Sequence, residues 1–459
     1  MRVHPNDFML EEFLGSLSRE HLRVVEHLTR CATCRRQLQG FSRGRPGPVA
    51  RRLADVLQWR GKAVDYEAAI QETERVLQTS ERALAEERAA APGLFVELTR
   101  LPSGERDVLL PDAPRFHTWG VFELLIERGL ETSIRDPGWS EELGLLALRL
   151  SEHLDAGRYG GELIEDLRAR AWAAIANSCR VRSDLQGAEE AFSCAYAHLR
   201  KGTRDLLERA MLLDLEASLR RDQRCFADAF RLLRRAVAIF LQNDQRHRAG
   251  RSLVKLSTVH HAAGDPEEAI PLLYRAIELI DPEEEPRLLL CARHNLIDYL
   301  AACGRFLEAQ KLYREARPLY RNFPDAWTQN RRHWVKGKIA RGIGQLEQAE
   351  SLFLAARDGF VAEGIPFDTA LVSLELAMLY TAQARMADLK RLAEEMVPIF
   401  SSLHIPREAL AALAYLRQAA ATEEATLELV SAVADFLRRA EHDPGLRFEC
   451  PPARPAALP

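Results

Sequence analysis

The stretch "GDPEEAIPLLYRAI", residues 264–277, decides the fold because related stretches recur along the chain. The two stretches most like it are "GRFLEAQKLYREAR" at 304–317 and "GQLEQAESLFLAAR" at 344–357. Three weaker relatives are "DLQGAEEAFSCAY" at 184–196, "RCFADAFRLLRRAV" at 224–237 and "ARMADLKRLAEEMV" at 384–397. Self-similarity at a fixed period of this length is the sequence signature of a repeat architecture.

Four positions in each repeat carry the pattern. The first anchor, spaced by 41 residues once and then by 40, is Ala188, Ala229, Ala269, Ala309, Ala349 and Leu389. Four residues later a larger side chain usually stands, in Phe192, Leu233, Leu273, Tyr313, Phe353 and Ala393. Seven residues after the first anchor are Ala195, Ala236, Ala276, Ala316, Ala356 and Met396. Twelve residues before it are mostly small residues: Ala176, Ala217, Ser257, Ile297, Gly337 and Ala377.

The spacing predicts a pair of helices in each repeat. Small residues recur where two helices must approach closely, and the larger residue between them fills the space between turns of one helix face. Gly264, Gly304 and Gly344 fall where the first helix of a pair must end, as helix C-caps do. One such hairpin cannot bury its apolar face alone, so the hairpins must stack. The predicted fold class is all-α, with an α-solenoid of helical hairpins and a degenerate seventh hairpin at about 405–440.

The small–large–small spacing resembles that of tetratricopeptide repeats. These units have 40 residues rather than the usual about 34, so their helices or turns must be longer. The resemblance implies that the array binds a peptide or protein segment along a concave groove. It names no groove residue; arginine and asparagine side chains on the first helices are candidates, with a solvated face as the plain alternative.

Composition narrows the function classes. The chain has 459 residues, a net charge of −4 and 47% apolar residues, which fits a folded protein and gives no global reason to expect nucleic acid as a partner. Eight cysteines are too few for a disulfide scaffold. No signal peptide and no run of about 20 apolar residues is present, so we expect a cytoplasmic protein with no membrane partner.

The sequence suggests five segments. Residues 1–38 form a small helical module and 39–63 a basic linker containing Gly and Pro. Residues 64–158 form a helical connector, broken at Pro102 and Asp136, in which 64–91 is one helix with an apolar stripe that packs against the body. The repeats occupy 159–441, and a Pro-rich tail follows at 442–459.

The first module contains "HLTRCATC", residues 27–34, which places His27, Cys31 and Cys34 within eight residues. Zn²⁺ prefers four tetrahedral nitrogen or sulfur ligands, and in a reducing compartment nearby cysteines favour metal over a disulfide. The residues leave His4 and His21 as candidates for the fourth ligand. The alternatives are a helix face without metal and a redox pair of Cys31 with Cys34. Four protein ligands would make the zinc structural, and zinc would help so small a module to fold.

Residues 4–38 also resemble the zinc-finger module of bacterial zinc-binding anti-sigma factors. The His-x₃-Cys-x₂-Cys spacing matches, as do Leu10, Phe13 and Leu14 of the first helix, whereas Gly15 comes one place early. The resemblance implies the ligand set His4, His27, Cys31 and Cys34, and a sigma factor as the partner. This chain differs from common members in its long repeat array and in lacking a membrane-spanning segment.

No phosphate-binding loop, nucleophile elbow or acid–base pair occurs, and "HH" at 260–261 points two imidazoles about 100° apart. We therefore expect no catalytic residues. The predicted function is a non-enzymatic adaptor, a bacterial-type regulatory protein whose zinc module and groove bind a protein partner. The alternative is a general assembly scaffold whose zinc module is purely structural.

Overall fold

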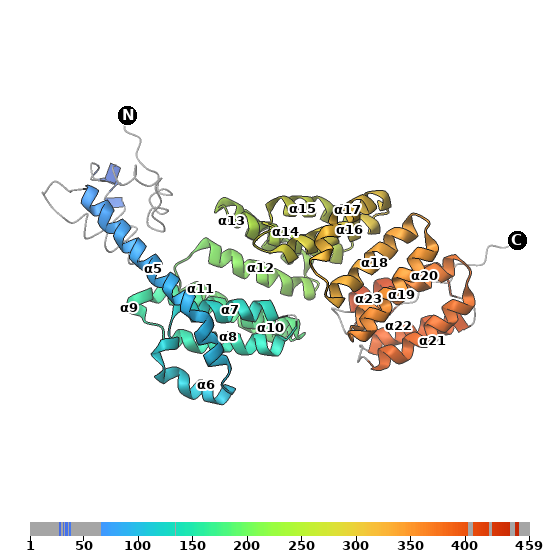
Figure 1. Ribbon diagram of the computed structural model, residues 1–459, viewed down its shortest axis with the longest axis horizontal. Helices are drawn as coiled ribbons and strands as arrows, with labels where there is room; N and C mark the ends of the chain where they lie inside the picture. The colour runs from blue at the N-terminus through green and yellow to red at the C-terminus, as the bar shows by residue number, and fades with distance from the viewer. Residues whose placement is uncertain are drawn as a thin grey trace. The chain divides into compact units, whose positions relative to one another are not determined.

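The computed structural model describes residues 27–28, 31, 33–34, 36–37, 66–133, 135–402, 407–421, 425–440 and 446–448. Within these residues the chain is helical and contains no strand (Figure 1). The prediction of an all-α repeat fold is confirmed. No helix among the described residues has the length and apolar character that crossing a membrane requires. The proposed segment 39–63 and the C-terminal tail from 449 lie outside the described residues.

The chain divides into two compact units, residues 1–215 and 216–459. In the first unit α5 packs on α7, α7 on α8, α8 on α10 and α10 on α11. Its helices are α5 (Tyr66–Thr99), α6 (Ser103–Leu109), α7 (Trp119–Thr132), α8 (Pro137–Glu152), α9 (Ala156–Tyr159), α10 (Gly161–Val181) and α11 (Leu185–Leu199). Two short 3₁₀ turns, Leu110–Asp112 and Pro114–Phe116, follow α6.

Both predicted breaks in the connector occur where the sequence places them. Pro102 precedes α6, and Asp136 caps α8 by accepting a 2.9 Å hydrogen bond from the Trp139 backbone N–H. The helix predicted for 64–91 instead continues to Thr99. Its apolar stripe does not pack along its whole length as expected: Ile70 is 40% exposed, and among the α5 side chains that the structure describes the first fully buried apolar one is Ala91.

The second unit is a stack of helical hairpins. The two helices of each hairpin pack on each other, and the next helix of the chain packs on the second helix of that hairpin. This holds for the hairpins α14–α15, α16–α17, α18–α19 and α20–α21. The helices are α13 (Phe226–Gln242), α14 (Arg246–Ala262), α15 (Pro266–Leu279), α16 (Pro286–Ala302), α17 (Phe306–Arg321), α18 (Ala326–Gly342), α19 (Leu346–Ala362), α20 (Pro366–Ala382) and α21 (Met386–Ser402). Helix α12 (Leu206–Asp222) contains the division between the units.

We call the even-numbered helices α10 to α20 the first helices of their hairpins, and α11 to α21 the second helices. First helices also contact one another, α14 with α16, α16 with α18 and α18 with α20. They therefore form one continuous layer of this unit. Each of the second helices α15, α17 and α19 packs on the first helix of its own hairpin and on the first helix that follows it.

The repeat positions found in the sequence form the core. All eighteen residues at the two anchors and the large position between them are buried, with at most 7% of the surface of any one exposed. Five of the six residues twelve places before the first anchor are fully buried, and Gly337 is buried as well. The predicted close approach is tightest at Gly337, where an added Cβ would lie 2.6 Å from the Phe353 ring.

Each first helix ends in the same left-handed turn. The residue in that turn has a positive φ in all six hairpins: Ser183 (64°), Arg224 (60°), Gly264 (96°), Gly304 (74°), Gly344 (81°) and Ala384 (54°). The backbone N–H of the next residue then bonds to a carbonyl five residues earlier, as from Gln345 to Ala340 at 2.8 Å. This is the Schellman motif, so the predicted role of the three glycines as helix ends is confirmed.

The array ends in two more helices, α22 (Arg407–Ala421) and α23 (Leu427–Ala440), where the degenerate hairpin was predicted. Helix α23 packs on α22 and also on α20. Because α19, α21 and α23 all contact α20, every residue from Thr369 to Ala377 is buried. The last hairpin thus closes the apolar end of the stack, as a capping repeat must.

Candidate functional site

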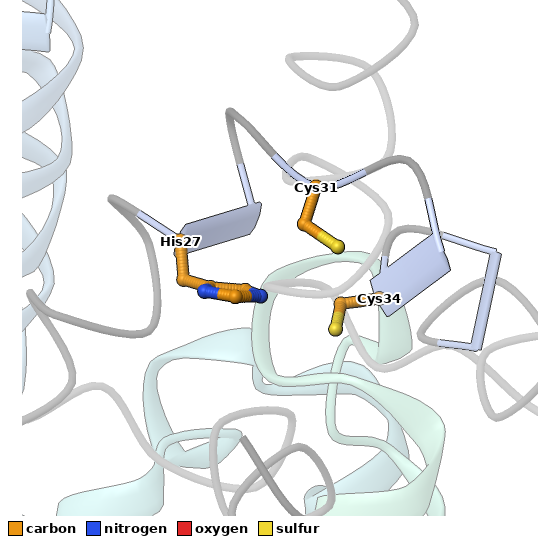
Figure 2. Close-up of side chains that lie close together, drawn as sticks. All are labelled: His27, Cys31 and Cys34. Atoms are coloured by element: carbon orange, nitrogen blue, oxygen red, sulfur yellow. The ribbon is translucent and has the colours of Figure 1, made fainter. Parts of the chain in front are cut away.

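Three side chains from the N-terminal module lie together. The Cys31 backbone N–H donates to the His27 carbonyl at 3.0 Å, one helical turn that places the two side chains on the same side. The ligand atoms of His27, Cys31 and Cys34 all lie within 4.8 Å of one another (Figure 2). Figure 2 shows the imidazole and the two thiols turned toward a common centre.

This donor set suits zinc. In a tetrahedral site with Zn–S distances of about 2.3 Å, two sulfur ligands lie about 3.8 Å apart, so small side-chain rotations would bring these atoms onto one ion. Two thiolates would cancel the charge of the dication. Without a cation beside it, burial raises the pKa of the Cys34 thiol, and the hydrogen bond and charge of Cys31 raise it further. His4 and His21 lie outside the described residues, so the fourth ligand stays a prediction.

A second group of side chains lies on the first helices α16 and α18. On α18, Trp327, Arg331, Trp334 and Lys338 fall at spacings of four, three and four, which places them along one stripe. The Arg331 guanidinium lies 5.0 Å from the centre of the Trp327 ring, and Lys338 Nζ lies 4.7 Å from that of Trp334. Trp327 is 43% exposed, which is unusual for so large an apolar ring.

Helix α16 contributes the neighbouring stripe. Asp298 Oδ1 accepts a 2.7 Å hydrogen bond from Lys338 Nζ, and the exposed Cys291 lies two turns earlier on the same helix. We call Cys291, Asp298, Trp327, Arg331 and Lys338 the first-helix face. Burial alone would raise the pKa of Asp298, but the Lys338 ammonium and then His294 hold it well below its ordinary value.

Histidines connect this face to the interior. His294 Nδ1 lies 2.8 Å from the Tyr320 hydroxyl, and burial, reinforced by Arg331, lowers the pKa of His294 to about 3. The adjacent pair at 260–261 separates as the helical spacing predicts: His260 lies 4.3 Å from the Phe230 ring, and His261 stacks on Tyr299 at 4.4 Å. These rings pack between helices.

The charge pattern of α18 could have indicated this face from the sequence. Between Ala326 and Leu346 the chain has five lysines or arginines and no aspartate or glutamate. A helix that carries several cations and no carboxylate is compatible with a solvated face, with pairing to neighbouring helices or with a binding surface. Arg341 pairs with Glu375 and Lys338 with Asp298, whereas in the described part of the chain Arg331 has no carboxylate partner.

Residues 208–281 match the tetratricopeptide repeat family model. The matched stretch runs from α12 to the end of α15, inside the array that the periodicity defines. The predicted resemblance to these repeats is therefore confirmed for this part of the chain. The match does not reach the N-terminal module, whose likeness to anti-sigma zinc fingers stays a prediction.

A solved structure shares the architecture. A Rap protein crystallised in complex with competence and sporulation factor superposes with a TM-score of 0.50, over 70% of this chain and 91% of that chain, at 11% sequence identity. At so low an identity the likeness establishes the fold alone. No curated protein matches this chain by sequence.

Proposed function

We propose that this chain is a protein-binding adaptor that holds a segment of its partner against the first-helix face. The observation that carries the proposal is the exposed Trp327 ring beside Arg331, on a helix without carboxylates. Tryptophan and arginine are the residues most enriched where protein interfaces concentrate their binding energy. The Rap protein that shares this architecture is itself bound to competence and sporulation factor, which supports a ligand-binding role for the array.

We further propose that His4, His27, Cys31 and Cys34 hold one structural zinc ion in the N-terminal module. The convergence of three donors of the right chemistry supports it. The resemblance of that module to anti-sigma zinc fingers makes a sigma factor the first partner to test. On this proposal the chain regulates transcription through a protein partner.

The alternative is a general assembly scaffold in which zinc only stabilises the module. Both functions use the same first-helix face, so the identity of the bound protein distinguishes them. Recovery of a sigma factor or RNA polymerase would support regulation. Recovery of unrelated assemblies alone would support the scaffold.

Site-specific cross-linking in the native cell tests the binding face. p-Benzoylphenylalanine at Cys291, which is exposed on α16, should form adducts with a partner on irradiation. The matched control is the same probe at Arg231, an exposed position on the second helix α13. Adducts at both positions in equal yield, or at neither, would contradict the proposed face.

A further inference from the structure

A cavity of about 230 Å³ is lined by the second helices α17 and α19 and by the first helix α18. Its apolar part is formed by Ile339 and Ala340 of α18, by Ile343 directly after that helix, and by the ring of Tyr313. Ile339, Ala340 and Tyr313 are buried, so they form a fixed floor. The rim is polar, with the amides of Gln310, Gln345 and Gln348.

In the part of the chain that the structure describes, four cations and no carboxylate line this cavity. They are Arg314 and Arg317 from α17 and Arg332 and Lys336 from α18. Among the described residues none of the four forms an ion pair, although neighbouring cations of the same helix, Lys338 and Arg341, both do. Within the described part of the protein, no carboxylate is therefore in direct contact with these four cations.

Two of the four make hydrogen bonds to neighbouring side chains: the Arg314 Nη2–H donates to Gln310 Oε1 at 2.8 Å, and Arg332 is bonded twice. The Arg332 Nε–H donates to the Tyr313 hydroxyl at 3.1 Å, and its Nη1–H donates to Gln329 Oε1 at 2.6 Å. These bonds use two of the guanidinium nitrogens and fix the plane of the group at the cavity wall. A guanidinium fixed in this way loses less side-chain entropy when it binds a carboxylate.

The cavity is separate from the first-helix face. Residues two apart on a helix point about 200° apart, so Lys336 faces away from Lys338. Arg332 likewise stands about 100° from Arg331. A ligand in the cavity would contact α17, the start of α19 and the side of α18 that carries Arg332 and Lys336. The first-helix face is formed by α16 and a different side of α18, which carries Arg331 and Lys338.

The geometry points to a second binding site, which takes an acidic protein segment that inserts one apolar side chain between α17 and α19. The four cations would pair with aspartate or glutamate on either side of that residue, and the floor of Ile339 and Ala340 would cover the apolar side chain. Inorganic phosphate would leave this floor unused. A nucleic acid needs cations that follow its backbone, whereas these converge on one cavity.

Fluorescence anisotropy on the full chain tests this site. The probe is a fluorescein-labelled peptide, Gly-Gly-Glu-Glu-Leu-Glu-Glu-Gly-Gly, compared with versions in which glutamine or lysine replaces every glutamate. We expect the glutamate peptide to bind most tightly and the lysine peptide least, with the difference shrinking at high salt because the pairs are exposed to solvent. Equal affinity for the three peptides, or no binding of the glutamate peptide, would overturn the proposal.

Two variants locate the binding. The double variant Arg332→Gln, Lys336→Gln should weaken the glutamate peptide about tenfold. The matched double variant Lys311→Gln, Lys390→Gln removes the same charge from exposed positions outside the cavity and should leave affinity unchanged. Gln348→Glu, an exposed change at the start of α19 that does not disturb packing, should also weaken binding.

The outcomes separate this site from other ligands and from the first-helix face. If ten millimolar inorganic phosphate displaces the peptide completely, the cavity is a small-anion site and the proposal fails. If the cavity variants bind like the matched control, the peptide lies elsewhere and the proposal also fails. Cross-linking at Cys291 tests only the first-helix face. A failure of the cavity proposal therefore leaves the proposed function standing, and a failure of the proposed function leaves the cavity proposal standing.

Discussion

Ala384 occupies a left-handed turn for which three other repeats use glycine. Its φ is 54°, and the equivalent Gly344 has a φ of 81° with nothing within 4 Å of an added Cβ. Because the surroundings are open, the difference between the two residues is purely conformational. We expect Ala384→Gly to stabilise the protein by about 1 kcal/mol and Gly344→Ala to destabilise it by a similar amount. Denaturant unfolding of the full chain measures both changes.

The control for this pair is Ala382→Gly, in the last turn of α20 and exposed. A helical alanine loses stability on replacement by glycine, by up to about 1 kcal/mol. The same substitution two residues apart should therefore act in opposite directions. Destabilisation at both positions would show that the left-handed turn does not limit stability.

His294 should make the array sensitive to acid. Its pKa is about 3 in the folded protein and near 6.5 when exposed, so between these values the unfolded chain binds a proton that the folded chain excludes. The free energy of unfolding should then fall as the pH drops from about 6.5 toward 3, by at most about 1.4 kcal/mol per pH unit from this group. The pair of Asp298 with Lys338 persists well below the ordinary carboxyl pKa, because the pKa of Asp298 is lowered, so its contribution to stability begins to fall only below about pH 4.

Two variants separate titration from the hydrogen bond. His294→Gln should flatten the pH dependence between pH 4 and 6.5. Tyr320→Phe removes the hydroxyl at 2.8 Å but keeps the imidazole, so it should lower stability by a similar amount at every pH. An unchanged slope in His294→Gln would mean that other groups, such as His260, His261 and His333, whose pKa values burial also lowers, dominate.

At the scale of helix pairs, the sequence predicted which residues pack but not every turn. Small and large residues at 40-residue spacing identify buried positions, because helix contact directly restricts side-chain size. Ser183 and Arg224 have positive φ at turns where their residue types give no such signal. The same local hydrogen bonds close these turns and the glycine turns, so the conformation could be inferred only by alignment with Gly264, Gly304 and Gly344.

In the N-terminal half of α5 the sequence predicted the helix correctly but not the exposure of its apolar stripe. The stripe containing Ile70 and Leu84 has helical spacing, and the helix is present, but Ile70 is exposed. Periodicity predicts an apolar face without naming what covers it. The same limit applies to the first-helix face: the spacing in the sequence places Trp327 and Lys338 on one stripe of α18, but only the fold shows that Trp327 is exposed and that Lys338 lies beside Asp298 of α16.

The pair Gly337 and Phe353 should behave as one unit of packing. Gly337→Ala would place a methyl group 2.6 Å from the Phe353 ring, and we expect a loss of about 1–3 kcal/mol. Adding Phe353→Leu should restore much of it, because another repeat of the array combines Ala217 with Leu233 at the same positions. Denaturant unfolding of both single variants and the double variant gives the coupling energy. Strictly additive losses would contradict the inferred contact.

At the scale of the whole molecule, zinc should stabilise the N-terminal module and leave the array intact. The purified full-length protein should contain about one equivalent of zinc, and Cys31→Ser or His27→Ala should lower that content. Cys291→Ser, an exposed cysteine on α16, is the matched control. His4→Ala and His21→Ala then identify the fourth ligand, because only one of them should release the metal. Full zinc content in Cys31→Ser would contradict the proposed site.

We propose that a partner binds the first-helix face, which α16 and α18 form. Hydrogen exchange of the full chain, alone and with the protein captured by cross-linking, tests it most directly. A partner on this face should slow exchange in residues 287–298 and 327–338 and leave α13 and α15, the internal controls, unchanged. Protection confined to the second helices α13 and α15, with no change in α16 and α18, would contradict it.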